Sequence, residues 1–79
     1  MKTKVEYFGM IAESLGRPLE EIVFESKADP LDLHAFFESK YPALKNMNYK
    51  IAVNQEFKTH LEPGCVPNEI ALLPPFAGG

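Results

Sequence analysis

The most constraining feature of this sequence is that it contains one helix-forming pattern of useful length, while its other apolar segments are short. Apolar residues recur at the spacing of one helix face at Leu33, Phe36, Phe37 and Tyr41. Pro42 should end this helix, because proline cannot continue a helical hydrogen-bond ladder. The core is therefore expected to form between one main helix and whatever the short segments build.

The predicted start of this helix lies at Asp29 and Pro30. The Asp29 side chain can cap exposed backbone amides, and Pro30 suits the first helical position. Asp32 adds a negative charge in the first turn, where the helix dipole favours it. A second, shorter helix is expected over Met10–Leu15, closed by Gly16, because glycine tolerates the left-handed conformation found there.

Five segments have the composition or alternation that is typical of β-strands. They cover residues 4–8, 20–25, 49–54, 57–58 and 69–73, with a turn at 54–55 and a loop over 61–68. A solvated strand face is expected for three glutamates, Glu20, Glu21 and Glu25. The order of the strands around one main helix predicts an α+β domain with a single sheet packed on that helix. The β-grasp fold fits this order.

Length and charge exclude several classes of protein. A chain of 79 residues fits one domain, expected to span residues 1–79. A net charge of -3 with scattered basic residues argues against nucleic-acid binding. The single cysteine, Cys65, excludes an internal disulfide and a cysteine-ligated metal cluster. No apolar run reaches the length of a signal peptide or a membrane span, so a cytoplasmic protein without a membrane partner is expected.

The segment after the last predicted strand carries the clearest chemical signal. Pro74 and Pro75 are stiff and extended, and residues 74–79 can reach about 20 Å from the body. Gly78 and Gly79 have no side chains, so they can thread a slot that excludes every other residue. Their terminal carboxylate is a poor electrophile, but adenylation by ATP would make it an acyl donor to a sulfur nucleophile. The product would be a thiocarboxylate at the end of a flexible arm.

Residues 70–79 resemble the C-terminal signature of the small subunit of molybdopterin synthase, the MoaD-type branch of the ThiS/MoaD sulfur-carrier family. That signature is an apolar strand, Pro-Pro, two small or apolar residues and Gly-Gly. Weaker similarities lie at residues 5–9, 15–16 and 52–55, so the resemblance spans nearly the whole chain. Where this family usually has a Gly-Asp turn before the last strand, the chain has Pro67, which cannot adopt positive φ. A differently shaped loop is expected there.

The resemblance implies a ubiquitin-like β-grasp fold with a mixed sheet. It implies that Gly79 is adenylated by a ubiquitin-activating-type enzyme and converted to a thiocarboxylate, while Gly78 threads the active site. The sulfur would pass to precursor Z, cyclic pyranopterin monophosphate, in molybdenum cofactor biosynthesis. A channel in the large subunit of molybdopterin synthase would be lined by Pro74, Pro75, Phe76 and Ala77.

The same resemblance implies a heterotetramer with that large subunit and no catalysis by the chain alone. ATP would be used by the activating partner, with no permanently bound cofactor. His34 and His60 lack metal-type spacing, and no metal site is predicted. Cys65 has no evident histidine partner and is expected to be incidental.

Three alternatives remain open. The chain can be a sulfur carrier for thiamine or another pathway, although Pro74 and Pro75 favour the molybdopterin version. It can be a ubiquitin-like modifier that forms isopeptide bonds with lysine. It can also be a binding module whose Gly78 and Gly79 carry no function, since chain ends are commonly mobile.

Overall fold

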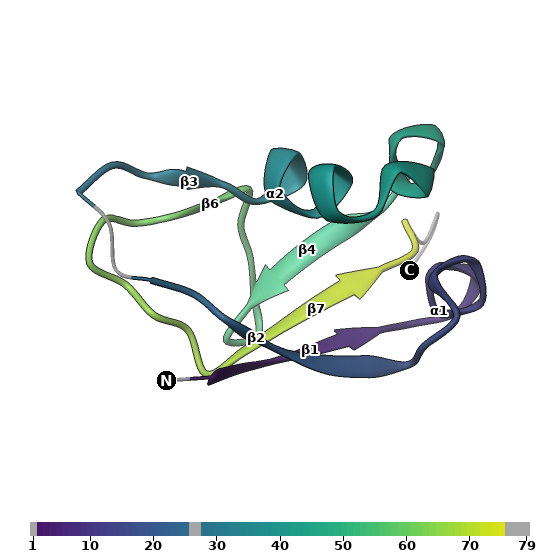
Figure 1. Ribbon diagram of the computed structural model, residues 1–79, viewed down its shortest axis with the longest axis horizontal. Helices are drawn as coiled ribbons and strands as arrows, with labels where there is room; N and C mark the ends of the chain where they lie inside the picture. The colour runs from purple at the N-terminus through teal and green to yellow at the C-terminus, as the bar shows by residue number, and fades with distance from the viewer. Residues whose placement is uncertain (1, 26–27, 76–79) are drawn as a thin grey trace.

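The computed structural model describes residues 2–25 and 28–75 (Figure 1). Two short helical segments and one longer helix accompany seven strands. In chain order the elements are β1 (Lys2–Tyr7), α1 (Met10–Leu15), β2 (Leu19–Val23), β3 (Leu31–Asp32), α2 (Leu33–Lys40), η1 (Pro42–Asn46), β4 (Lys50–Val53), β5 (Glu56–Phe57), β6 (His60–Leu61) and β7 (Glu69–Leu73).

Five strands form a mixed sheet in the order β2-β1-β7-β4-β5. The first and last strands, β1 and β7, pair in parallel at its centre, with Val5 opposite Ile70 and Tyr7 opposite Leu72. All other neighbours in this sheet are antiparallel. This arrangement is the β-grasp fold, and it confirms the predicted α+β class with a mixed sheet packed on one main helix.

The core lies between the sheet and the layer formed by α2 and η1 (Figure 1). Leu33 and Phe37 on α2 are fully buried, as is Leu44 on η1. Phe36 and Tyr41 are half-buried and pack against the same cluster, so the predicted apolar face of the helix is confirmed. Alternation in the central strands supplies the opposing side chains, which include Val5, Tyr7, Ile51, Val53, Ile70 and Leu72.

The predicted start of the main helix was wrong by three residues. The helix begins at Leu33, and its cap is Asp32, whose Oδ1 accepts a hydrogen bond from the Ala35 amide at 3.1 Å. Leu31 instead belongs to β3, which pairs with β6 and opposes Leu61. Both pairing partners fall outside the predicted strands, because this two-residue ladder is held by contacts distant in sequence.

Turns and boundaries follow the local signals more closely. Gly16 closes α1 at φ 75, as predicted. The predicted turn at 54–55 joins β4 to β5, and both of its residues have positive φ, which suits a two-residue hairpin. In the loop of residues 61–68, positive φ falls on Gly64, while Pro67 is buried and its carbonyl accepts the Thr3 hydroxyl at 2.7 Å. The loop therefore avoids a positive φ at Pro67, as expected.

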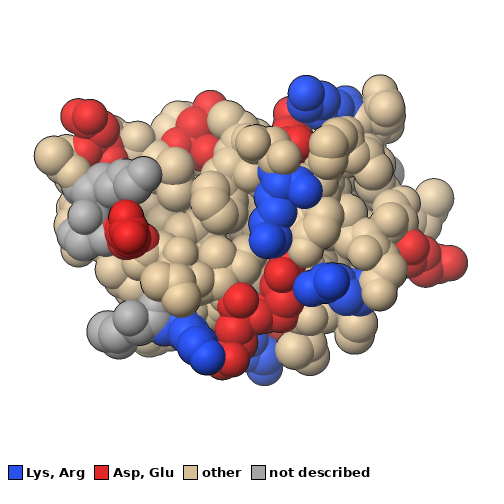
Figure 2. Space-filling model, in the orientation of Figure 1, with Lys and Arg blue, Asp and Glu red and all other residues tan. Residues whose placement is uncertain are grey.

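Charges on the surface are mixed in sign. On the face seen in Figure 2, acidic and basic side chains are interspersed among broad areas of uncharged residues. None of the helices described is long and apolar enough to cross a membrane. Within residues 2–25 and 28–75, no group of three or more His, Cys, Asp or Glu is placed to hold a metal ion.

Candidate functional site at the root of the tail

The C-terminal tail follows β7, the central strand of the sheet. This last strand is flanked by β1 on one side and β4 on the other, and Ile70 and Leu72 are buried in the core. Pro74, a predicted site residue, is half-buried, and Pro75 is exposed. The other predicted site residues lie outside the described part of the chain: Phe76, Ala77, Gly78 and Gly79. The structure thus fixes the root of the tail.

The end of β7 is set by its prolines. Leu73 is the last residue of the ladder, where it opposes Lys50 of β4. On the other side, the Phe8 amide donates to the Leu72 carbonyl at 3.2 Å. Pro74 and Pro75 have no amide hydrogen, so neither can donate a hydrogen bond to an adjacent strand. The chain must therefore part from the sheet at this point.

Gly9 and Pro74 meet where the tail begins. Gly9 has φ 58 and ψ -134, a conformation that disfavours any residue with a side chain. A Cβ added to Gly9 would lie 3.1 Å from Pro74 Cγ. The absence of a side chain at Gly9 therefore gives Pro74 its position. Sequence reasoning missed this role of Gly9.

The face of the sheet turned away from α2, here called the outer face, is apolar near the tail. Strand alternation puts Leu73 and Ala71 on this face, with Ala71 opposite Ala52 and Ala52 opposite Phe57. Phe57 is 67% exposed and Phe8 is 41% exposed. We call this group the apolar patch, defined by Phe8, Ala52, Phe57, Ala71 and Leu73. Its exposed members are the two phenylalanines, while Ala52 is 8% exposed and the charged residues Glu6 and Lys50 lie opposite Ala71 and Leu73.

The opposite end of the outer face is charged. Lys2 and Glu21 approach to 3.9 Å, and Lys4 and Glu6 to 3.7 Å. The first pair is well exposed on both sides. Its contribution to stability is therefore small. Val23, opposite Lys2, is 61% exposed, so an apolar side chain reaches the surface at this end as well.

Behind the apolar patch, a carboxylate on β2 joins three elements. Glu20 accepts hydrogen bonds from the hydroxyls of Tyr7 on β1 and Tyr41 at the end of α2. Arg17 lies 3.3 Å from the same carboxylate. The Glu20 side chain is only 11% exposed, so the expectation of a solvated face was wrong for this residue. The two tyrosines turn it inward, because a partly buried carboxylate needs hydrogen-bond donors.

The ionisation of these groups is shifted accordingly. Burial acts to raise the pKa of Glu20, but the hydrogen bonds from Tyr41 and Tyr7, together with the charges of Lys40 and Arg17, hold this pKa below its usual value. Burial and the bond to Glu20 raise the pKa of Tyr7 and of Tyr41. At neutral pH the cluster is one carboxylate held by two neutral phenols, and it ties the start of β2 and the end of α2 to the strand beside the tail.

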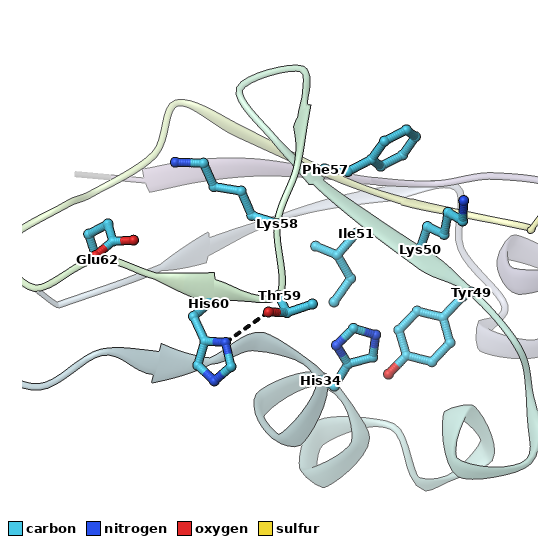
Figure 3. A pocket seen from close by; sticks show the side chains of 9 residues that line it. All are labelled: His34, Tyr49, Lys50, Ile51, Phe57, Lys58, Thr59, His60 and Glu62. Atoms are coloured by element: carbon cyan, nitrogen blue, oxygen red, sulfur yellow. Dashed lines mark hydrogen bonds between the residues drawn. The ribbon is translucent and has the colours of Figure 1, made fainter.

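The remaining candidate residues lie elsewhere. His34 stacks on the Tyr49 ring with centroids 4.9 Å apart, and His60 Nδ1 lies 2.9 Å from the Thr59 hydroxyl (Figure 3). Both histidines line a groove beside β4 and β5. Cys65 is exposed in the loop before β7. None of the three contributes to the root of the tail.

Comparison with known proteins assigns the fold and the tail to one group. The model of the ThiS family matches residues 5–79, which includes the last residue of the chain. A relative from Caenorhabditis briggsae, described as a molybdopterin synthase sulfur carrier subunit, is 31% identical over 86 aligned positions. That alignment covers 100% of this chain and 99% of the relative.

Two solved structures share the fold. One is a putative molybdopterin converting factor, subunit 1, from Pyrococcus furiosus, with a TM-score of 0.72 and 24% identity, covering 96% of this chain and 99% of that one. The other is SAMP1 from Haloferax volcanii, with a TM-score of 0.70 and 21% identity, and the two chains cover each other fully. At this level of identity the two matches establish the common architecture.

Proposed function

Since this chain belongs to the ThiS family of sulfur carriers, we propose that it is the sulfur-carrying small subunit of a molybdopterin synthase. The observation that carries the proposal is that the family match runs to residue 79, so that it includes Gly78 and Gly79 as well as the body. The relative from Caenorhabditis briggsae, named as a molybdopterin synthase subunit, supports this branch of the family.

The proposed chemistry takes place at the carboxylate of Gly79. Attack of this carboxylate on the α-phosphorus of ATP forms an acyl adenylate and releases pyrophosphate. A hydrosulfide-type nucleophile then attacks the acyl carbon, a carbon–sulfur bond forms, and AMP leaves. The thiocarboxylate sulfur then bonds to precursor Z, and water cleaves the acyl carbon–sulfur bond, which leaves the sulfur on the acceptor and returns the Gly79 carboxylate. Gly78 is proposed to thread the active sites in which these steps occur, because a residue without a side chain needs the least room.

Two kinds of protein partner are required by this scheme. A ubiquitin-activating-type enzyme binds ATP and adenylates Gly79, and the large subunit of molybdopterin synthase receives the sulfur-loaded tail. The apolar patch lies next to Pro74, so a partner that covers it can hold the tail in its channel at the same time. We expect the large subunit to form a heterotetramer with this chain, in which residues 74–77 line the channel.

Intact mass spectrometry tests the proposal directly. The protein is incubated with a matching adenylating enzyme, ATP and a sulfur source, and the expected result is a mass gain equal to exchanging one oxygen for sulfur. Fragmentation should assign the gain to Gly79. The matched control is the chain without Gly79, which should gain nothing.

The same experiment separates the alternatives. Sulfur gain followed by transfer to a thiamine precursor, with none to precursor Z in the presence of a large subunit, would favour the thiamine version. Higher-mass conjugates through lysine in cell extract would favour a ubiquitin-like modifier. No mass change with an enzyme that activates another carrier would leave the plain binding module.

A further inference from the structure

A groove of about 570 Å³ lies where β5 separates from β4, on the side of the molecule that faces α2. Ile51 lies in the middle of the residues drawn in Figure 3, with the rings of His34 and Tyr49 beside it. The exposed ring of Phe57 lies at one rim. The floor is formed by Ile51 and Tyr49, which belong to the core and are 2% and 9% exposed, so the exposed ring of Phe57 is the apolar surface that a ligand can reach.

Basic groups outnumber acidic ones around this floor. Lys50 and Lys58 line the groove together with one carboxylate, Glu62. Among the described residues neither lysine has an ion-pair partner, and Lys50 lies over the Phe57 ring at 5.3 Å from its centroid. The chain as a whole carries a net charge of -3, so a positive rim here is a local property that runs against the overall charge.

The placement of the lysines favours an extended ligand over a small anion. The amines of Lys50 and Lys58 point toward different ends of the groove (Figure 3). One phosphate or carboxylate cannot contact both, whereas a peptide that carries several carboxylates can. An apolar side chain between two acidic ones would meet the exposed ring of Phe57 while its neighbours meet the lysines.

The groove also adjoins the surface beside the tail. Lys50 opposes Leu73, the last residue before the prolines, and Phe57 belongs to both the groove and the apolar patch. A protein that covers the patch can therefore continue around the edge of the sheet into the groove. We propose that this groove binds an acidic peptide segment of a partner protein, with alternating carboxylate and apolar side chains, as a second docking site separate from the tail.

A titration followed by nuclear magnetic resonance tests this inference without any sulfur chemistry. The isotopically labelled full chain is titrated with a blocked synthetic peptide, Asp-Leu-Glu-Phe-Asp-Leu, and with its counterpart in which lysine replaces each acidic residue. We expect saturable shifts at residues 49–51 and 57–62 with the acidic peptide and none with the basic one. The outcome does not depend on the proposed function, because no activation of Gly79 is involved.

Matched variants locate the site. Lys58→Glu should weaken binding of the acidic peptide about fivefold, and Phe57→Ser should weaken it by a similar factor. Lys45→Glu makes the same charge change on η1, outside the groove, and should leave the affinity unchanged. The signals of residues away from the groove report whether each variant is folded.

Three outcomes would overturn the inference. The acidic peptide produces no saturable shift, or its affinity falls equally in Lys58→Glu and Lys45→Glu, which indicates general charge attraction. Alternatively, inorganic phosphate or AMP competes at lower concentration than the peptide, which identifies a small-anion site.

Discussion

The two ends of the outer face are built from the same strands but held in different ways. At the tail end, apolar side chains are exposed, Gly9 accommodates Pro74 closely, and Glu20 is buried against two tyrosines. At the opposite end, exposed ion pairs such as Lys2–Glu21 cover the strands. The difference teaches that the close contacts of Gly9 with Pro74 and of Glu20 with two tyrosines lie where the tail begins. Exposed apolar side chains occur at both ends, since Val23 opposite Lys2 is 61% exposed.

The largest expected effect is a loss of sulfur transfer without a loss of stability, which would show that the tail carries the function and the body carries the fold. Deletion of Gly79, or Gly78→Phe, should abolish sulfur transfer, because the acyl group is lost or the thread no longer fits its slot. The melting temperature should barely change, since these residues follow the last strand of the sheet. Transfer assays and thermal denaturation of the same samples measure both effects. Retained sulfur transfer in either variant would refute the proposed function.

Two glycines with positive φ form the next comparison, although Gly9 has ψ -134 and Gly16 has ψ 18. Gly9→Ala should destabilise the protein by about 3 kcal/mol, because strain at positive φ adds to the contact with Pro74. Gly16→Ala has φ 75 but meets nothing within 4 Å, and it should cost about 1 kcal/mol. Chemical denaturation gives both values. Gly9→Ala should also weaken binding to the large subunit, and equal behaviour of the two variants would remove the argument for a fixed tail root.

The contribution of the Glu20 cluster to stability should be lost in acid. The lowered pKa of Glu20 means that the folded state favours its charged form, so its contribution is present at neutral pH. That contribution is lost as the pH falls below the usual value of 4.5 and through the lowered one. Glu20→Gln should cost about 1–2 kcal/mol at pH 7, since charged hydrogen bonds become neutral ones. In this variant the free energy of unfolding should also fall less steeply as the pH is lowered through the acid range. Chemical denaturation at a series of pH values measures this dependence.

The smallest effect belongs to the solvated end. Lys2→Ala removes the exposed pair with Glu21 and should change the free energy of unfolding by less than about 0.5 kcal/mol. The same denaturation experiment measures it, and partner affinity should stay the same. A loss as large as that of Glu20→Gln would mean that the two ends of the face do not differ in the way described.

Sequence predicted the elements whose signals are local. Gly16 ends α1, alternation marks β7, and Pro74 ends that strand, and each of these features depends on residues within a few positions of one another. The start of α2 was missed because Asp29 and Asp32 are both competent caps. The pairing of Leu31 with Leu61 decides between them, and no local pattern contains it.

In the candidate site, too, the features set by neighbouring residues were predicted, and the contacts between distant residues were not. The tail was predicted from consecutive residues and from family resemblance, since its chemistry needs only Gly78 and Gly79 at the end of an extended segment. Gly9 and Pro74, which are in contact, lie 65 positions apart in the sequence (74 minus 9). Glu20 and Tyr41, which share a hydrogen bond, lie 21 positions apart. Only the register of the sheet brings such residues together.

The parallel pairing of the first and last strands also has a consequence for synthesis. A chain emerging from the ribosome can form the β1–β2 hairpin early, but β1 and β4 have no connection until β7 arrives between them. The slowest loop to close is therefore the one that spans almost the whole chain. The sheet is complete only when β7 is present, so a truncated translation product lacking β7 would be left as separate hairpins exposed to proteolysis.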